Sequence, residues 1–204
     1  HPSKDQIINQ AIQFHLKGNI QEATKNYQYC INQGFNDPNV FSNYAAILKD
    51  LGKLQEAELF FRKAIELNPK FANAHYNLGI TLKDLGKLQE AQLSTQKAIE
   101  LNPDDAEAHS SLGSILIDLG KLQEAQLSTQ KAIELNPDLA EPHSNLGTIF
   151  KDLGKFKEAE NCYSKAISLK PDDTNFKMNR SKLFFDNEQY NLALKDSDAC
   201  NTKE

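Results

Sequence analysis

Apolar and polar positions follow each other with helical spacing along most of the chain. Leu78 and Leu82 are four residues apart, the interval that places two side chains on one face of an α-helix. This block ends at Gly86, and glycine is the residue that best tolerates the left-handed conformation after a helix C-terminus. A second block begins at Leu88 and stops before Pro103, since proline disfavours helix in the residue before it. The pattern predicts two helices joined by a short turn.

This two-helix pattern recurs with a period of 34 residues. One ladder of prolines and one of glycines mark it, at Pro69, Pro103, Pro137 and Pro171 and at Gly18, Gly52, Gly86, Gly120 and Gly154. Residues 84–104 recur unchanged as 118–138, which indicates a recent duplication. With the proline at the thirty-second place, the units are 4–37, 38–71, 72–105, 106–139, 140–173 and 174–204, and the last is incomplete. We expect one array of these units over 4–204.

The composition narrows the classes of function. The net charge is -5 and the arginines are Arg62 and Arg180 alone, so a nucleic-acid interface is not expected. The apolar runs are too short to predict insertion into a membrane. Cys30, Cys162 and Cys200 show no disulfide framework and no paired metal-ligand spacing, which favours a reducing, cytoplasmic compartment.

The chain begins with His1 rather than methionine, so residues 1–3 are predicted to be an N-terminal extension or a cloning remnant. No glycine-rich phosphate loop, zinc-protease motif or nucleophile elbow occurs in the sequence, so we expect no catalysis, cofactor or metal. His75, His109 and His143 share the fourth place of their units. Successive units stack too far apart for these histidines to ligate one zinc ion, and a packing role is the expectation.

The landmarks of the units resemble those of the tetratricopeptide repeat. In the fifth unit they fall on Leu146-Gly147, Gly154, Ala159, Tyr163, Ala166 and Pro171. Thr95 and Thr129 replace the aromatic residue in the third and fourth units. The resemblance implies an all-α fold, a right-handed α-solenoid of six stacked helix-turn-helix units. The end units depart from the pattern, with Phe35 in the place of proline and Arg180-Ser181 in the place of Leu-Gly.

The resemblance also implies a peptide-binding groove lined by the first helix of each unit. Its sixth place holds Asn9, Asn43, Asn77, Ser111, Asn145 and Asn179. An amide both donates and accepts hydrogen bonds, so such a ladder can hold an extended peptide backbone. This ladder is similar to the one in the repeat region of O-linked N-acetylglucosamine transferases. The alternative is that the amides bond to neighbouring helix backbone, and both readings stay open.

A second series occupies the thirteenth place of the units, at Asp50, Asp84, Asp118, Asp152 and Asp186. Aspartate opposes the dipole at a helix C-terminus, so its recurrence suggests a use such as binding basic side chains of a ligand. Adjacent lysines and the recent duplication are the explanation that we favour slightly. Tyr76 and Ile80 add apolar contacts to the predicted groove.

The acidic tail of heat-shock chaperones is not an expected ligand. The repeat arrays that bind it carry lysine at the fifth place of one unit and arginine at the sixth place of another. No fifth place of this chain is lysine and no sixth place is arginine.

We therefore predict a non-catalytic scaffold that binds a protein or an extended peptide, with a bias toward basic ligands. The alternative is a substrate-presenting repeat module of a larger enzyme such as a glycosyltransferase. The chain ends without a polar capping helix, which suggests a fragment of a longer protein. Self-association through the end units is a third possibility.

Overall fold

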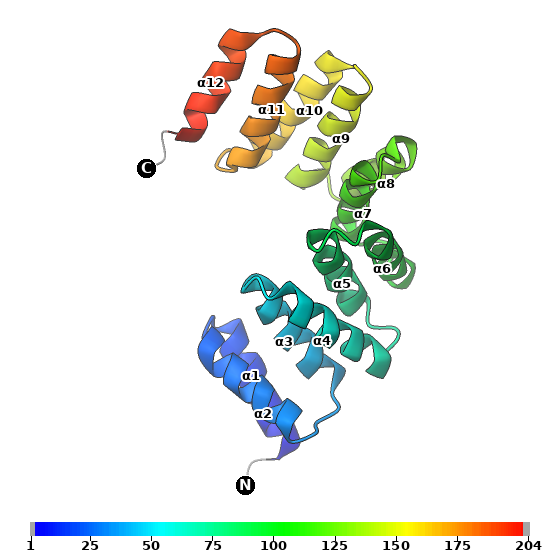
Figure 1. The fold of residues 1–204 in the computed structure, drawn as a ribbon, viewed down its shortest axis with the longest axis vertical. Helices are drawn as coiled ribbons and strands as arrows, with labels where there is room; N and C mark the ends of the chain where they lie inside the picture. The colour runs from blue at the N-terminus through cyan, green and yellow to red at the C-terminus, as the bar shows by residue number, and fades with distance from the viewer. Residues whose placement is uncertain (1–2, 202–204) are drawn as a thin grey trace. The chain divides into compact units, whose positions relative to one another are not determined.

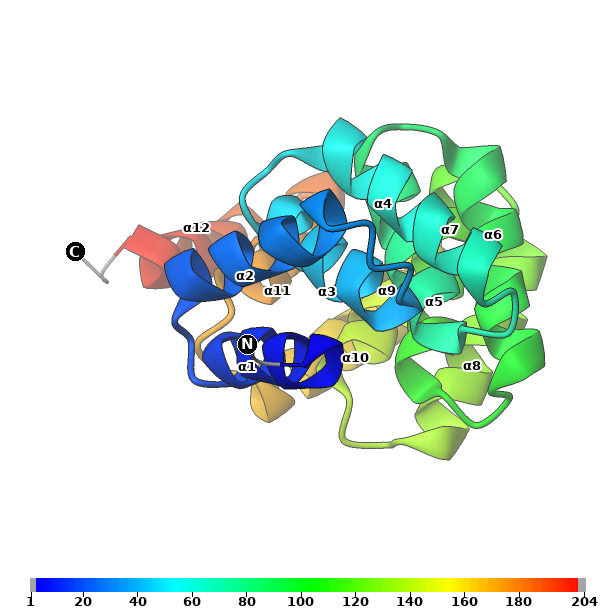
Figure 2. The ribbon, with the colours of Figure 1, turned by 90° about the horizontal axis from the view of Figure 1, so that it is seen from below.

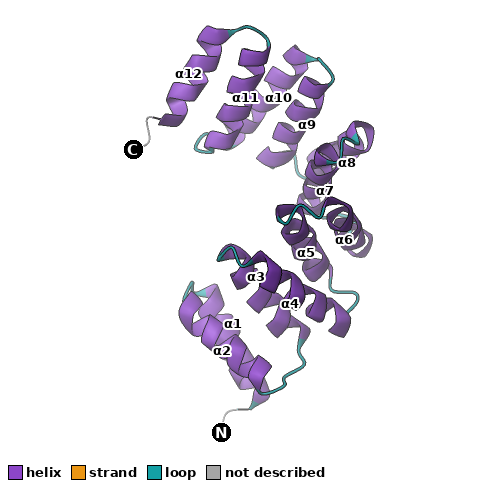
Figure 3. Cartoon of the chain, in the orientation of Figure 1, coloured by secondary structure: helices purple, strands orange, loops and turns teal. Residues whose placement is uncertain are grey.

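The computed structural model describes residues 3–201, apart from the side chains at 190, 191 and 201. The predicted extension at 1–3 and the end of the last unit at 202–204 therefore lie largely outside the described residues. The described residues form twelve helices and no strand. Figure 3 shows these helices joined by loops. None of these helices is long and apolar enough to cross a lipid bilayer.

The helices form pairs, one pair for each 34-residue unit. Their bounds are α1 Lys4–Leu16 and α2 Ile20–Asn32, α3 Pro38–Asp50 and α4 Leu54–Leu67, α5 Ala72–Asp84 and α6 Leu88–Leu101, α7 Ala106–Asp118 and α8 Leu122–Leu135, α9 Ala140–Asp152 and α10 Phe156–Leu169, α11 Thr174–Asp186 and α12 Tyr190–Asn201. The two helices of a pair pack on each other, and α5 beside α6 is visible in Figures 1 and 2. This is the predicted all-α helical repeat solenoid.

The helices divide into two compact units, residues 1–103 and 104–204, with three helix pairs in each. In the first unit the second helices α2 and α4 pack on the first helices α3 and α5 of the following pairs. In the second unit α8 and α10 pack on α9 and α11 in the same way. One continuous array of all six repeats stays a prediction.

The turn between the two helices of a pair places one residue in the left-handed backbone conformation, and in five of the pairs that residue is glycine. Gly86 has φ +74° after α5, and the other four glycines of the ladder have φ of +72° to +74°. The last pair has Glu188 at this place, with φ +59°. A side chain in this conformation costs roughly 1–2 kcal/mol, so the last turn is less favourable than the others.

Small residues let the two helices of a pair approach closely. A Cβ added at Gly147 in α9 would lie 2.8 Å from the ring of Tyr163 in α10. At Gly79 in α5 it would lie 2.2 Å from the hydroxyl oxygen of Thr95 in α6. The Leu-Gly and threonine positions of the sequence pattern are therefore the contact points within the pairs.

Two buried phenols predict that the chain loses stability at alkaline pH. Tyr27 in α2 and Tyr163 in α10 are 0% and 1% exposed. Burial raises the pKa of each from 10.0 to about 12. The unfolded chain therefore releases these protons first, and the free energy of unfolding falls as the pH rises from about 10 to about 12.

Measuring the free energy of unfolding in urea at the two ends of this pH range tests the prediction. The chain with Tyr27→Phe and Tyr163→Phe should lose less stability across the range than the unchanged chain, since phenylalanine has no proton to release. Equal losses in both chains would contradict the assignment.

Candidate functional site

The first helices carry the residues that the sequence predicted to line a groove. We call the first-helix face the second, fifth, sixth, ninth, twelfth and thirteenth residues of each repeat. First helices of neighbouring repeats contact each other within each unit, as in α3 with α5, α7 with α9 and α9 with α11. The second helices instead pack on the first helix of the next repeat. The side chains of the first-helix face can therefore reach from one repeat to the next.

Hydrogen bonds from the amide nitrogen hold three of the predicted asparagines, Asn77, Asn145 and Asn179. In the second unit Asn145 Nδ2 donates to the carbonyl oxygen of Ser110 at 3.0 Å. Asn179 Nδ2 donates to the hydroxyl of Ser144 at 3.3 Å. These two bonds link α9 to α7 and α11 to α9, so the amides tie each first helix to the one before it.

In the first unit the asparagine at the sixth place of the third repeat bonds within its own helix. Asn77 Nδ2 donates to the carbonyl oxygen of Asn73 at 2.9 Å, one turn earlier in α5. Asn43 is half-buried and Asn9 is exposed. One N–H of Asn77 and one N–H of Asn145 thus bond to nearby helix backbone, which is one of the two interpretations of the sequence. In the described part of the chain no donor reaches the amide oxygen of either residue.

The aspartates of the thirteenth place are each the last residue of a first helix. The Asp50 side chain is 72% exposed and lies 3.5 Å from the Lys49 ammonium. Asp152 lies 3.7 Å from Lys151 in the same arrangement. Asp84 and Asp118 are also exposed. The adjacent lysines therefore offset part of the acidic charge at this end of the first helices.

The apolar members of the predicted site lie on α5. Tyr76 and Ile80 are both half-buried, one turn apart. Ile80 also follows Asn77 by three residues, so an apolar side chain and an amide are neighbours on this helix.

The histidines of the fourth place have a structural partner. A ring nitrogen of His75 lies 3.0 Å from the Pro69 carbonyl oxygen, and His143 Nε2 lies 2.9 Å from that of Pro137. These contacts hold the start of a first helix against the turn before it. Among the described residues no group of three histidine, cysteine or acidic side chains is placed to bind one metal ion.

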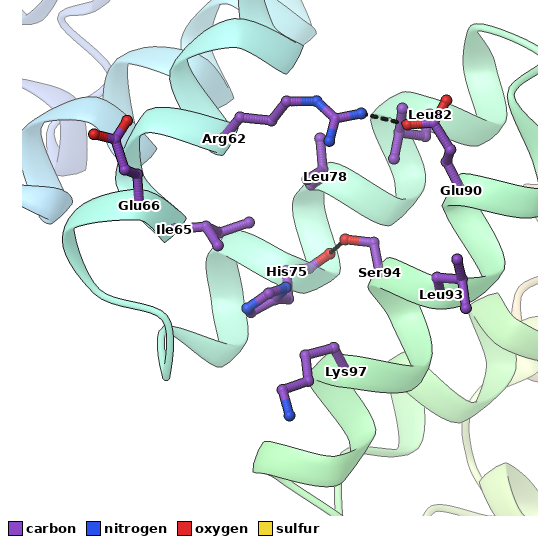
Figure 4. A pocket seen from close by; sticks show the side chains of 10 residues that line it. All are labelled: Arg62, Ile65, Glu66, His75, Leu78, Leu82, Glu90, Leu93, Ser94 and Lys97. Atoms are coloured by element: carbon purple, nitrogen blue, oxygen red, sulfur yellow. Dashed lines mark hydrogen bonds and ion pairs between the residues drawn. The ribbon is translucent and has the colours of Figure 1, made fainter.

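A groove that the sequence did not predict lies on the second helices of the first unit. It has a volume of about 460 Å³, with α4 and α6 as its walls and α5 as its floor. Figure 4 shows Ile65, Leu78 and Leu82 directed toward this space, and Leu93 at its edge is 67% exposed. We call it the second-helix groove. The exposed leucine recurs as Leu59 and Leu127. The signal for the groove in the sequence was the presence of His75 and Ser94 at the places of Phe41 and Phe60 in the second repeat.

An ion-pair network borders the second-helix groove. Glu58 accepts hydrogen bonds from the Arg62 guanidinium at 2.9 Å and from Lys87 Nζ at 2.8 Å. Burial alone raises the pKa of the Glu58 carboxyl, but the bonds from Lys87 and Arg62 hold it below its usual value. Arg62 also pairs with Glu90 of α6. The network therefore joins α4 to the start of α6.

The repeats match models of a protein family and several solved structures. Family models described as tetratricopeptide repeat or TPR repeat match residues 38–71, 60–93, 95–127, 113–154 and 140–173. Together these cover more than half of the chain. Among curated proteins no sequence matches significantly.

Solved structures with the same fold include a tetratricopeptide repeat protein from Parabacteroides merdae. It has a TM-score of 0.82 and 22% identity, over 98% of this chain and 80% of that one. YrrB, a TPR protein with an unusual peptide-binding site, has a TM-score of 0.62 and 24% identity, over 85% of this chain and 90% of that one. MamA from Desulfovibrio magneticus has a TM-score of 0.73 and 24% identity, over 82% and 95%. The recurring landmarks, the paired helices and the matched family models together show that the chain belongs to the tetratricopeptide repeat family.

Proposed function

We propose that the chain is a non-catalytic scaffold that binds an extended segment of another protein along the first-helix face. The proposal rests on the hydrogen bonding of the Asn77 and Asn145 side-chain amides. The nitrogens of Asn77 and Asn145 are bonded to the protein, which orients each amide, while the oxygens accept no bond from the described residues. An oriented and unused acceptor is what a backbone N–H of a bound peptide requires.

The acidic series supports a preference for basic segments. Asp50 and Asp84 are exposed at the ends of α3 and α5, one repeat apart. Since Lys49 neutralises Asp50 in part, the preference should be modest and should weaken in salt. YrrB, whose fold is similar, has a peptide-binding site by its own description. A substrate-presenting role in a glycosyltransferase and self-association through the end units stay predictions.

Removing two amides should weaken peptide binding. A peptide selected from a random library against the full chain provides the ligand, and fluorescence anisotropy measures its affinity. Asn77→Ala with Asn145→Ala removes one acceptor from each unit, worth about 0.5–1.5 kcal/mol apiece, so for a peptide held by either unit we expect a loss of about twofold to tenfold.

Asn161→Ala is the matched control, because Asn161 is exposed on the second helix α10 and lies outside the first-helix face. It should leave the affinity unchanged. Circular dichroism checks that both variants keep their helices. An unchanged affinity in the Asn77 and Asn145 variant would refute the proposed site, and a stronger response to an acidic than to a basic peptide of equal length would refute the charge preference.

A further inference from the structure

The second repeat shows how the space beside a second helix is filled in this chain. Phe41 of α3 and Phe60 of α4 stack with ring centroids 6.1 Å apart, and Tyr44 meets Phe60 edge to face at 5.0 Å. Gln28 of the preceding helix α2 donates to the Tyr44 hydroxyl at 2.8 Å. Aromatic side chains of the repeat itself therefore close the junction between α2, α3 and α4.

The third repeat has smaller side chains at the same three places. His75 stands where the second repeat has Phe41, Leu78 where it has Tyr44, and Ser94 where it has Phe60. These three residues line the second-helix groove between α4 and α6. The groove is thus the space that rings occupy one repeat earlier in the same unit.

The polar groups around the groove already have partners within the protein. Ser94 donates to the carbonyl oxygen of His75 at 2.9 Å, and the His75 ring contacts the Pro69 carbonyl. Lys97 pairs with Glu100 at 2.7 Å on the same helix. At the opposite wall Arg62 is bonded to Glu58 and Glu90. An occupant therefore gains little from hydrogen bonds or charge, and apolar contact is the chemistry that the groove offers.

We propose that the second-helix groove receives an aromatic side chain carried by a partner protein. The ring takes the place that Phe60 and Phe41 fill in the second repeat, over the floor of Leu78 and Leu82 and beside the exposed Leu93. This site lies on the second helices, so it is separate from the first-helix face and does not depend on the peptide-binding proposal. Aromatic residues placed in pockets of this kind are common anchors of protein interfaces.

The test uses the full chain and two small probes, N-acetyl-phenylalanine amide and N-acetyl-serine amide. Backbone amide signals of α4, α5 and α6 are followed by nuclear magnetic resonance as each probe is added. We expect saturable shifts confined to residues around the groove, with the phenylalanine probe binding about tenfold or more tightly than the serine probe. That ratio corresponds to burial of one phenyl side chain.

Two variants decide whether the groove is responsible. His75→Phe with Ser94→Phe copies the second repeat and fills the space, so it should abolish the shifts. Leu93→Glu places a charge at the exposed edge without touching the core and should weaken binding at least several-fold. Leu59→Glu is its matched control, because Leu59 is 68% exposed at the same place of the second repeat and does not line the groove.

Several results would overturn the inference. They are equal binding of the two probes, shifts that persist in the filled variant, or equal effects of Leu93→Glu and Leu59→Glu. Self-association abolished by Leu93→Glu, without any preference for the phenylalanine probe, would assign the groove to a second copy of the chain instead.

Discussion

Replacing Tyr163 with alanine is expected to destabilise the second unit by about 3–5 kcal/mol, the range for removing a buried aromatic side chain. The Tyr163 side chain is 1% exposed and belongs to a core cluster with Ala159 of α10 and Leu183 of α11, against which Phe150 and Phe156 pack. It therefore joins three helices from two repeats. Its loss leaves a cavity that the surrounding helices can close only in part.

Tyr163→Phe is the control, because it keeps the ring and removes only the hydroxyl, which lies 3.0 Å from Thr148 Oγ1. It should cost about 0.5–1.5 kcal/mol. Repeat proteins open locally, so native-state hydrogen exchange, read separately for α1–α6 and α7–α12, is the suitable measurement. Comparable losses for the alanine and phenylalanine variants would show that the hydroxyl, and not ring packing, holds this junction.

Arg180→Ala is expected to lower the free energy of unfolding of the second unit by a similar amount, about 3–5 kcal/mol, because it leaves a buried carboxylate without its partner. Arg180 Nε and Nη2 donate to the two carboxylate oxygens of Asp196 at 2.7 and 2.8 Å. Nη1 donates to the Ser164 hydroxyl of α10 at 2.9 Å. The Asp196 side chain is 9% exposed, so water cannot replace these bonds. The guanidinium thus joins α11 to both α12 and α10.

The third repeat supplies the control for this pair. It has Leu78 and Ser94 at the places of Arg180 and Asp196. Arg180→Leu with Asp196→Ser should therefore recover most of the stability lost in Arg180→Ala, because it removes both charges together. Hydrogen exchange of α11 and α12 measures the effect. A double variant as unstable as Arg180→Ala would mean that the loss does not come from leaving the Asp196 charge unpaired.

The spacing of apolar residues and the residues at the turns were enough to predict the helices and where they end. The period, the Leu-Gly pairs and the prolines predicted twelve helices in six pairs, because backbone conformation at a turn depends on one or two residues. Gly86 adopts the left-handed conformation that its place after a helix required. The identical residues 84–104 and 118–138 also form the same turn and helix, α6 in one copy and α8 in the other.

The candidate site was only partly predictable. Periodicity placed Asn77 and Asn145 at equivalent positions, yet one bonds within its own helix and the other to the preceding repeat. An amide has several partners within reach, and the carbonyl oxygen that Asn145 contacts lies 35 residues earlier in the sequence. The second-helix groove was missed for a related reason. It is a space between three helices, and its presence depends on the sizes of His75, Leu78 and Ser94 together.

The repeat, the helices and the family could thus be predicted from the amino-acid sequence, since these follow from periodic spacing and local backbone preferences. Which polar groups are already bonded, which buried charge has a partner and where space remains became visible only in the folded chain. These properties belong to packed surfaces of several helices, and packing depends on the volumes and directions of side chains that are distant in sequence.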